Sequence, residues 1–281
     1  MTFSKLEFHR RRLLRFCIGL FVTAVAVVPT VRAGDYDLDE FKVRITGMWF
    51  FTNPTGTVQA SGSDPLGNFN LTKDFGFNSY STLTGKVDWK FTHKNHLYLA
   101  VSPFSQSHTS VLNRTIDFQG QTFEVGLTTT AKLTNWAYAP GYQYDIIRRD
   151  RGHLGIAVQI DLFDTTAKLS AAAQVTGDGT QTAAKSVSAS LLAPIPLAGP
   201  DFRFYILPKF YVDGNLFGMY LFGYGNFLST VDTVGVYLGK HVSLRAGYQL
   251  GQRLVVNNNS TTRIGINLTQ KGPVAGVEFS L

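Results

Sequence analysis

The chain has 281 residues, a hydrophobic fraction of 44% and a formal net charge of +7, enough for one large β domain or two ordinary domains. Residues 1–33 hold six of the 26 basic residues and one of the 19 acidic residues, so residues 34–281 carry 20 basic and 18 acidic residues, a net charge of only +2. Nucleic-acid binding is therefore not expected. With Cys17 as the one cysteine, a disulfide scaffold is excluded.

The N-terminus has the layout of a secretory signal peptide over residues 1–33. A basic stretch ends at Arg15, an apolar stretch covers residues 16–28, and residues 31–33 fit the small-residue cleavage pattern. The apolar run is short for a membrane span, although an N-terminal anchor helix is the alternative. Residues 34–40 are expected to form a short, solvated periplasmic lead-in.

From residue 41 onward, apolar and polar residues alternate with a period of two, which indicates β-strands with one apolar face. In one such stretch Val87 and Trp89 alternate with Lys86, Asp88 and Lys90. Turn residues divide the chain into about ten segments of this kind. We expect strands at residues 41–52, 81–92, 96–110, 123–147, 153–168, 185–197, 202–213, 219–238, 242–256 and 262–281.

Short and long connections alternate along the chain. The short ones are 93–95, 148–152, 198–201 and 239–241, and the longer ones are 53–80, 111–122, 169–184, 214–218 and 257–261. This alternation is typical of a transmembrane up-and-down antiparallel β-barrel with short periplasmic turns and longer extracellular loops. The sequence therefore predicts an all-β barrel of about ten strands over residues 41–281.

Strand parity predicts which residues face lipid and which face the barrel interior. A Lys or Arg facing lipid at the bilayer midplane costs about 2–4 kcal/mol, so the charged face is expected inside. Aromatic residues are expected at the lipid interface, namely Trp49, Phe51, Trp89, Phe91, Tyr142, Tyr144, Phe202 and Phe204. The predicted interior charge network consists of Lys42, Arg44, Lys86, Asp88, Lys90, Asp145, Asp161, Arg203, Lys209, Asp213, Arg245, Arg253, Arg263, Lys271 and Glu278.

The last eleven residues, KGPVAGVEFSL, place Val277, Phe279 and Leu281 on one face of the final strand. This pattern resembles the C-terminal assembly signal of Gram-negative outer-membrane β-barrel proteins, although here the aromatic residue is Phe279 and the chain ends on Leu281. The resemblance implies a monomer in the outer membrane, surrounded by its lipid and inserted by the barrel-assembly machinery. A change of parity near Gly272 predicts a β-bulge there.

Two functions remain open for such a barrel, a narrow channel for small solutes or a closed structural scaffold. A cationic lining would favour small anionic solutes, with Arg203, Arg245 and Arg263 as candidates for a constriction. The alternatives are a surface adhesin, a surface hydrolase that uses His108 with neighbouring serines, and a secreted soluble lipocalin-like barrel. We expect no enzyme activity, and the sequence has no spacing that indicates a metal or cofactor site.

Overall fold

The computed structural model describes residues 38–60, 68–70, 79–118, 120–175, 181–221, 225–256 and 264–281. All of them belong to one compact unit, Asp37–Leu281. The predicted signal peptide at 1–33 lies outside the described residues. Within the described ranges, no helix is long and apolar enough to cross a membrane.

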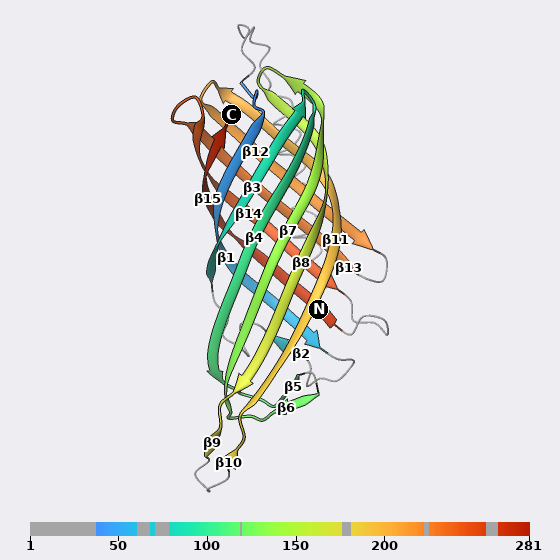
Figure 1. Ribbon diagram of the computed structural model, residues 1–281, viewed down its shortest axis with the longest axis vertical. Coiled ribbons are helices and arrows are strands. Elements are labelled where there is room, and N and C mark those ends of the chain that lie inside the picture. Colours follow the sequence, from blue (N-terminus) through green and yellow to red (C-terminus); the bar gives the residue numbers. More distant parts are fainter. Residues whose placement is uncertain are drawn as a thin grey trace, which may run out of the picture. The chain divides into compact units, whose positions relative to one another are not determined.

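Ten long strands form one closed antiparallel sheet (Figure 1). Each strand pairs with the next long strand in the chain, and β15 pairs with β1, for example Ile45 with Phe279, to close the barrel. The long strands are β1 (Val43–Ala60), β3 (Tyr80–Thr92), β4 (Asn95–Val111), β7 (Thr128–Arg149), β8 (Gly152–Ala171), β11 (Lys185–Leu207), β12 (Phe210–Leu221), β13 (Gly225–Tyr237), β14 (Val242–Val256) and β15 (Ile264–Ser280).

The two ends of the barrel differ. At one end, which we call the turn end, β1 begins, β15 ends and short turns join neighbouring strands. At the opposite loop end, β4, β7, β8 and β11 extend furthest (Figure 1). Five short strands lie among the connections, namely β2 (Asn68–Asn70), β5 (Ile116–Phe118), β6 (Gln121–Phe123), β9 (Gln174–Val175) and β10 (Gln181–Thr182).

The predicted strand boundaries are wrong in one region. Residues 198–201, read as a turn because of Gly199 and Pro200, lie inside β11, and the turn instead falls at residues 208–209. Residues 202–213 therefore span the end of β11 and the start of β12. The strand predicted at 219–238 is divided between β12 and β13. One predicted turn is absent and another lies elsewhere, so the number of long strands is ten, as predicted.

The outer surface of the barrel is apolar, as a membrane barrel requires. Val87 on β3 and its register partner Leu99 on β4 are each 47% exposed, whereas Asp88, the next residue on β3, is 5% exposed. A soluble barrel would bury the apolar face instead, so the lipocalin-like alternative is wrong. Of the predicted interface aromatics, Phe202 and Phe204 are half-buried and the others are exposed, namely Trp49, Phe51, Trp89, Phe91, Tyr142 and Tyr144.

The final strand alternates without the predicted bulge. Its pairing with β1 runs in step through Gly272, and the irregularity lies instead in β14, between Gln249 and Gln252. Val277, Phe279 and Leu281 are all exposed on the outer face.

Candidate functional site

The chain segment before β1 folds into the turn end of the barrel. Asp39 is 1% exposed and Phe41 is 4% exposed. The backbone N–H of Leu38 donates to the carbonyl of Asp150 at 2.8 Å, and that of Lys42 donates to the carbonyl of Leu281 at 2.5 Å. The prediction of a solvated lead-in is therefore wrong for the part of it that the structure describes.

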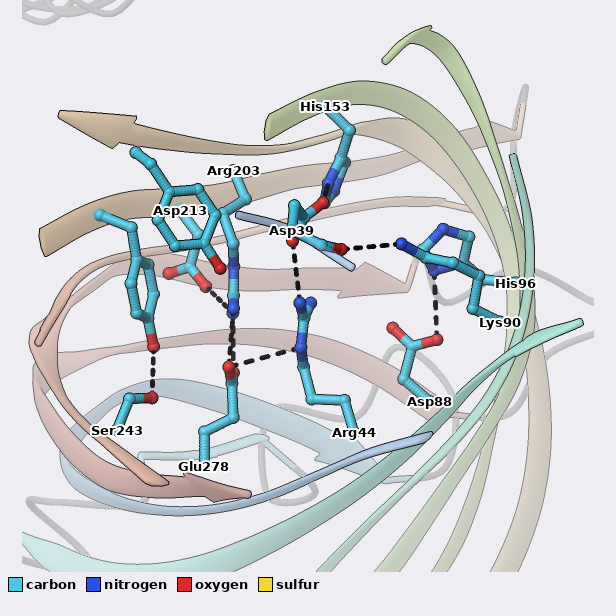
Figure 2. A network of polar contacts seen from close by, with 12 residues as sticks. Asp39, Arg44, Asp88, Lys90, His96, His153, Arg203, Asp213, Ser243 and Glu278 are labelled. Atoms are coloured by element: carbon cyan, nitrogen blue, oxygen red, sulfur yellow. Dashed lines mark hydrogen bonds and ion pairs between the residues drawn. The ribbon is translucent and has the colours of Figure 1, made fainter. Parts of the chain in front are cut away.

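Asp39 gathers cationic side chains from four strands into one cluster, most of which Figure 2 shows. Its carboxylate accepts hydrogen bonds from Arg44 on β1 at 2.9 Å, Arg148 on β7 at 3.1 Å and His153 on β8 at 2.5 Å. Its backbone carbonyl accepts one from Lys90 at 3.0 Å. Burial alone would raise the pKa of Asp39, but His153, Arg44 and Lys90 together hold that pKa well below its usual value. The lead-in is therefore held by charge on several sides.

Phe41 adds apolar and cation–π contacts to the cluster around Asp39. The guanidinium of Arg44 lies 3.7 Å from the centre of the Phe41 ring, and the ammonium of Lys90 lies 4.1 Å from it. The ring of His96 meets it edge-on, with ring centres 5.5 Å apart. An aromatic face favours cations in a dry site, so one phenylalanine covers two of the charges that bind Asp39.

Two buried histidines each bridge a pair of carboxylates. His96 Nδ1 lies 3.2 Å from Asp88 and its Nε2 lies 3.0 Å from Asp145. His153 lies between Asp39 and Asp201 in the same manner, with Nε2 3.3 Å from Asp201. A carboxylate accepts hydrogen bonds and does not donate them when ionised. Each imidazole ring is therefore held in place by a carboxylate at both of its ring nitrogens.

A second centre lies around Glu278 on β15. Arg203 binds its two carboxylate oxygens at 2.6 and 2.7 Å, and Arg245 binds it at 2.9 Å. Both arginines also bind Asp213 on β12. Arg44, whose Nε lies 3.4 Å from Glu278, joins this centre to Asp39 (Figure 2). The result is a continuous charged network across the turn end.

The charges of this network nearly balance. Buried cations and carboxylates alternate in it, so each charge has an oppositely charged neighbour, as burial of ions requires. Its members are Arg44, Lys90, His96, Arg148, His153, Arg203 and Arg245 with Asp39, Asp88, Asp145, Asp201, Asp213 and Glu278.

The interior also holds two apolar clusters and a small cavity that network residues such as Arg203 and Asp213 line in part. The cavity has a volume of about 220 Å³ and is lined in part by Lys86, whose ammonium lies 4.3 Å from the centre of the Tyr98 ring. One cluster comprises Tyr98, Ala157, Ile195, Leu197, Phe217 and Phe227. The other lies toward the loop end, where Leu268 packs against it, and comprises Leu112, Ile116, Phe118, Phe123, Ala131, Leu169 and Ala171.

Most of the predicted interior charges lie inside the barrel. Those placed there are Arg44, Lys86, Asp88, Lys90, Asp145, Asp161, Arg203, Asp213, Arg245 and Glu278. Asp161 accepts a hydrogen bond from Gln159 at 2.6 Å. Arg263 lies outside the described residues, so of the three residues proposed for a constriction only Arg203 and Arg245 are located, and both are bound to carboxylates.

Four predicted interior charges are exposed instead. Lys42 precedes β1 and Lys209 lies in the turn between β11 and β12. Lys271 shares the outer face of β15 with Val277, because this strand has no bulge to change its parity. Arg253 is exposed because the irregularity in β14 reverses which of the later residues of that strand face outward. Its register partner Leu228 on β13 is exposed as well.

Several members of the network were missed by the sequence analysis. Asp39 was assigned to a solvated tail, and Asp201 to a turn that does not exist. His96 and His153 stood at the start of predicted strands, beside short turns, and neither was assigned to the interior. Strand parity could have found His96, because it alternates with the exposed residues Leu97 and Leu99 on β4.

His108, the candidate of the hydrolase alternative, lies half-buried on the same face of β4 as His96. Ser105 and Ser107 lie on the opposite, exposed face of that strand, whereas Ser110, two residues further on, shares the face of His108. Among the residues that the structure describes, no group of three His, Cys, Asp or Glu side chains could hold a metal ion.

No protein-family model matches this chain, and no curated protein matches its sequence. Among solved structures it is similar to the outer-membrane protease OmpT from Escherichia coli, with a TM-score of 0.55 and 10% identity over 89% of this chain and 99% of that one. The fold is that of an outer-membrane β-barrel.

Two further likenesses have lower TM-scores. The attachment invasion locus protein Ail of Yersinia pestis gives a TM-score of 0.34 at 9% identity, covering 85% of this chain and 99% of that one. The toluene transporter TodX of P. putida gives 0.37 at 7% identity, covering 88% and 93%. At such identities the comparisons inform the fold and leave the function to the chain's own residues.

Proposed function

We propose that the protein is an outer-membrane β-barrel of a Gram-negative bacterium whose interior is closed, so that it serves as a scaffold and not as a channel for small solutes. The observation that carries this proposal is the buried contact of Asp39 with Arg44, Arg148 and His153 at the turn end. A segment held by three cationic partners blocks the path that a solute would take.

The packing beyond the turn end supports the same function. A conducting barrel needs a continuous water-filled path, whereas the apolar cluster with Phe217 and Phe227 takes up interior space beside β4, β8, β11, β12 and β13. Nearer the loop end, Phe118 and Phe123 from β5 and β6 pack into the barrel wall beside Leu169. In this proposal the lead-in and the two apolar clusters close the interior at three levels, and the cavity reaches from the charged network to Phe217.

The long strands suggest what the scaffold carries. A membrane-spanning strand needs about 9–11 residues, but β7, β8 and β11 have 22, 20 and 23 residues. The turn end is periplasmic in this proposal, so the excess length forms a wall above the outer leaflet. This wall holds the β5–β6 and β9–β10 hairpins away from the membrane, where a surface partner can reach them.

Two experiments test this proposal. An epitope inserted after Gly120, at the exposed tip of the β5–β6 hairpin, is expected to bind antibody on intact cells, whereas one inserted after Lys240 in a periplasmic turn is not. Vesicles that contain the protein are expected to retain small anions. Antibody binding at Lys240 instead of Gly120 contradicts the orientation, and rapid anion efflux contradicts the closure.

The narrow channel is the second candidate, and Lys86 is the observation in its favour. Its side chain lines the interior cavity, and the nearest carboxylate oxygen, of Asp88, lies 4.0 Å away. This cation is less well compensated than Arg203 or Arg245. An anion-selective current that Lys86→Gln abolishes is the result that would favour this function over the closed scaffold.

A further inference from the structure

Two lysines lie directly opposite each other on the outer face of the barrel. Lys132 on β7 and Lys168 on β8 are register partners, and both are exposed. Side chains of directly opposite residues on neighbouring antiparallel strands start about 4.5–5.5 Å apart, and like charges in such positions repel each other. β7 and β8 lie side by side along their whole length (Figure 1).

Nothing in the described part of the chain compensates these two charges. Neither ammonium takes part in an ion pair or a side-chain hydrogen bond there. Their neighbours in the same row across the sheet are the exposed hydroxyl residues Ser107 on β4 and Ser188 on β11. Asp164, on the same face of β8, is paired in register with Trp136 and makes no ion pair with Lys168.

The row lies at the level expected for lipid headgroups. Trp136 and Tyr138 stack on the same outer face of β7, with ring centres 6.2 Å apart, and such exposed aromatic residues mark the edge of the hydrocarbon region. Lys132 is four residues further toward the loop end. Four residues of a strand span about 13 Å, or about 10 Å along the membrane normal for a typical tilt. The ammonium groups therefore lie beyond the hydrocarbon.

We propose that Lys132 and Lys168 together bind a monoester phosphate on the headgroup of an outer-leaflet lipid. A monoester phosphate carries a charge of about −1.5 to −2 at neutral pH, so one such group neutralises both lysines. Its three oxygens can accept hydrogen bonds from the two ammonium groups and from Ser107 and Ser188. A phosphodiester lipid carries one charge and matches the pair less well. The site rests on the proposed outer-membrane orientation but not on the closure of the interior.

Lipid binding in detergent tests the site. The purified protein is titrated with diphosphoryl lipid A, and retained lipid is counted by native mass spectrometry. Lys132→Gln with Lys168→Gln is expected to weaken binding at least tenfold, and so is dephosphorylation of the lipid. Lys132→Arg with Lys168→Arg is expected to retain binding. Lys209→Gln with Lys240→Gln, two exposed lysines at the turn end, is the matched control. An equal loss in the control, or tight binding of dephosphorylated lipid, overturns the proposal.

Thermal unfolding separates a lipid site from a structural role. In a zwitterionic detergent without lipid, Lys168→Gln is expected to raise the unfolding temperature, because it removes the repulsion from Lys132. Added diphosphoryl lipid A should then stabilise the wild type and not the variant. A lower unfolding temperature for the variant without lipid, or equal stabilisation by inorganic phosphate alone, contradicts a lipid phosphate site. Lipid binding and unfolding temperature do not depend on whether vesicles leak anions. The lipid site can therefore be disproved while the closed scaffold stands, and the reverse.

Discussion

Arg203 and Glu278 form a two-point ion pair across the barrel interior. The guanidinium nitrogens of Arg203 lie 2.6 and 2.7 Å from the two carboxylate oxygens of Glu278, although the residues are 75 positions apart in the chain. β11 and β15 are separated by β12, β13 and β14 in the sheet. This contact therefore braces two walls of the barrel that are not neighbours.

Removal of Glu278 is expected to destabilise the barrel strongly. Glu278→Ala leaves Arg203 and Arg245 buried with fewer counter-charges, and loss of one partner of a buried ion pair costs about 3–5 kcal/mol. Denaturant unfolding in lipid vesicles measures this change in the free energy of unfolding. Glu124→Ala, at an exposed loop residue, is the control and should change it by less than about 0.5 kcal/mol. Equal effects of the two substitutions would show that the brace has no energetic role.

The stability that Asp39 contributes should depend on pH. Its pKa in the folded protein is well below the usual value, so folding favours the ionised carboxylate. The contribution is therefore complete above the unfolded pKa of about 3.9 and is lost as the pH falls toward the folded pKa. The free energies of unfolding of the wild type and Asp39→Asn are expected to differ at pH 7 and to converge in acid. A difference that stays constant down to pH 2 would contradict a charged Asp39.

Cysteine labelling can test whether the lead-in is folded into the turn end. Without residues 1–33 the chain has no cysteine, so a single introduced thiol reports on its own site. Glu40→Cys, at an exposed position, is expected to react rapidly with a maleimide, and Phe41→Cys only as fast as the turn end opens. Equal rates in the folded protein would mean that the lead-in lies free in solvent.

Gly235 is expected to be required for the packing of Tyr211. A Cβ atom at Gly235 would lie 2.1 Å from Cζ of Tyr211, and the hydroxyl of this tyrosine lies 2.8 Å from Ser243 Oγ. Gly235→Ala should therefore displace the ring and lower the free energy of unfolding by about 1–3 kcal/mol. Gly85→Ala adds a methyl group where nothing lies within 4 Å, and serves as the control. Equal stabilities would show that the ring moves without cost.

Strand parity predicted the fold and much of the interior, because a lipid surround leaves only one face of each strand for charges. It succeeded for Arg203 and Glu278, because the register shift of β11 comes only after Tyr205 and β15 alternates through Glu278. It was wrong for Arg253, because one extra residue in β14 reverses the faces beyond it. Irregularities of this kind depend on the pairing with neighbouring strands, which a single strand's sequence does not contain.

The centre of the network could not be predicted from alternation. Asp39 belongs to no strand, and its burial depends on Arg44, Arg148 and His153, which come together only when the barrel closes. Asp201 was hidden by Gly199 and Pro200, which are typical turn residues but here lie within the pairing of β11 with β8. A site built from residues of distant strands requires the three-dimensional register.

Single-channel recording in planar bilayers tests the central claim most directly. The wild-type protein is inserted after its folding has been verified by heat-modifiable migration on a denaturing gel, with a conducting porin in the same bilayer as the positive control. With Asp39 and Phe41 across the turn end and the apolar clusters beyond them, no discrete conductance steps are expected from the folded barrel. Reproducible steps from folded wild-type protein would contradict a closed interior.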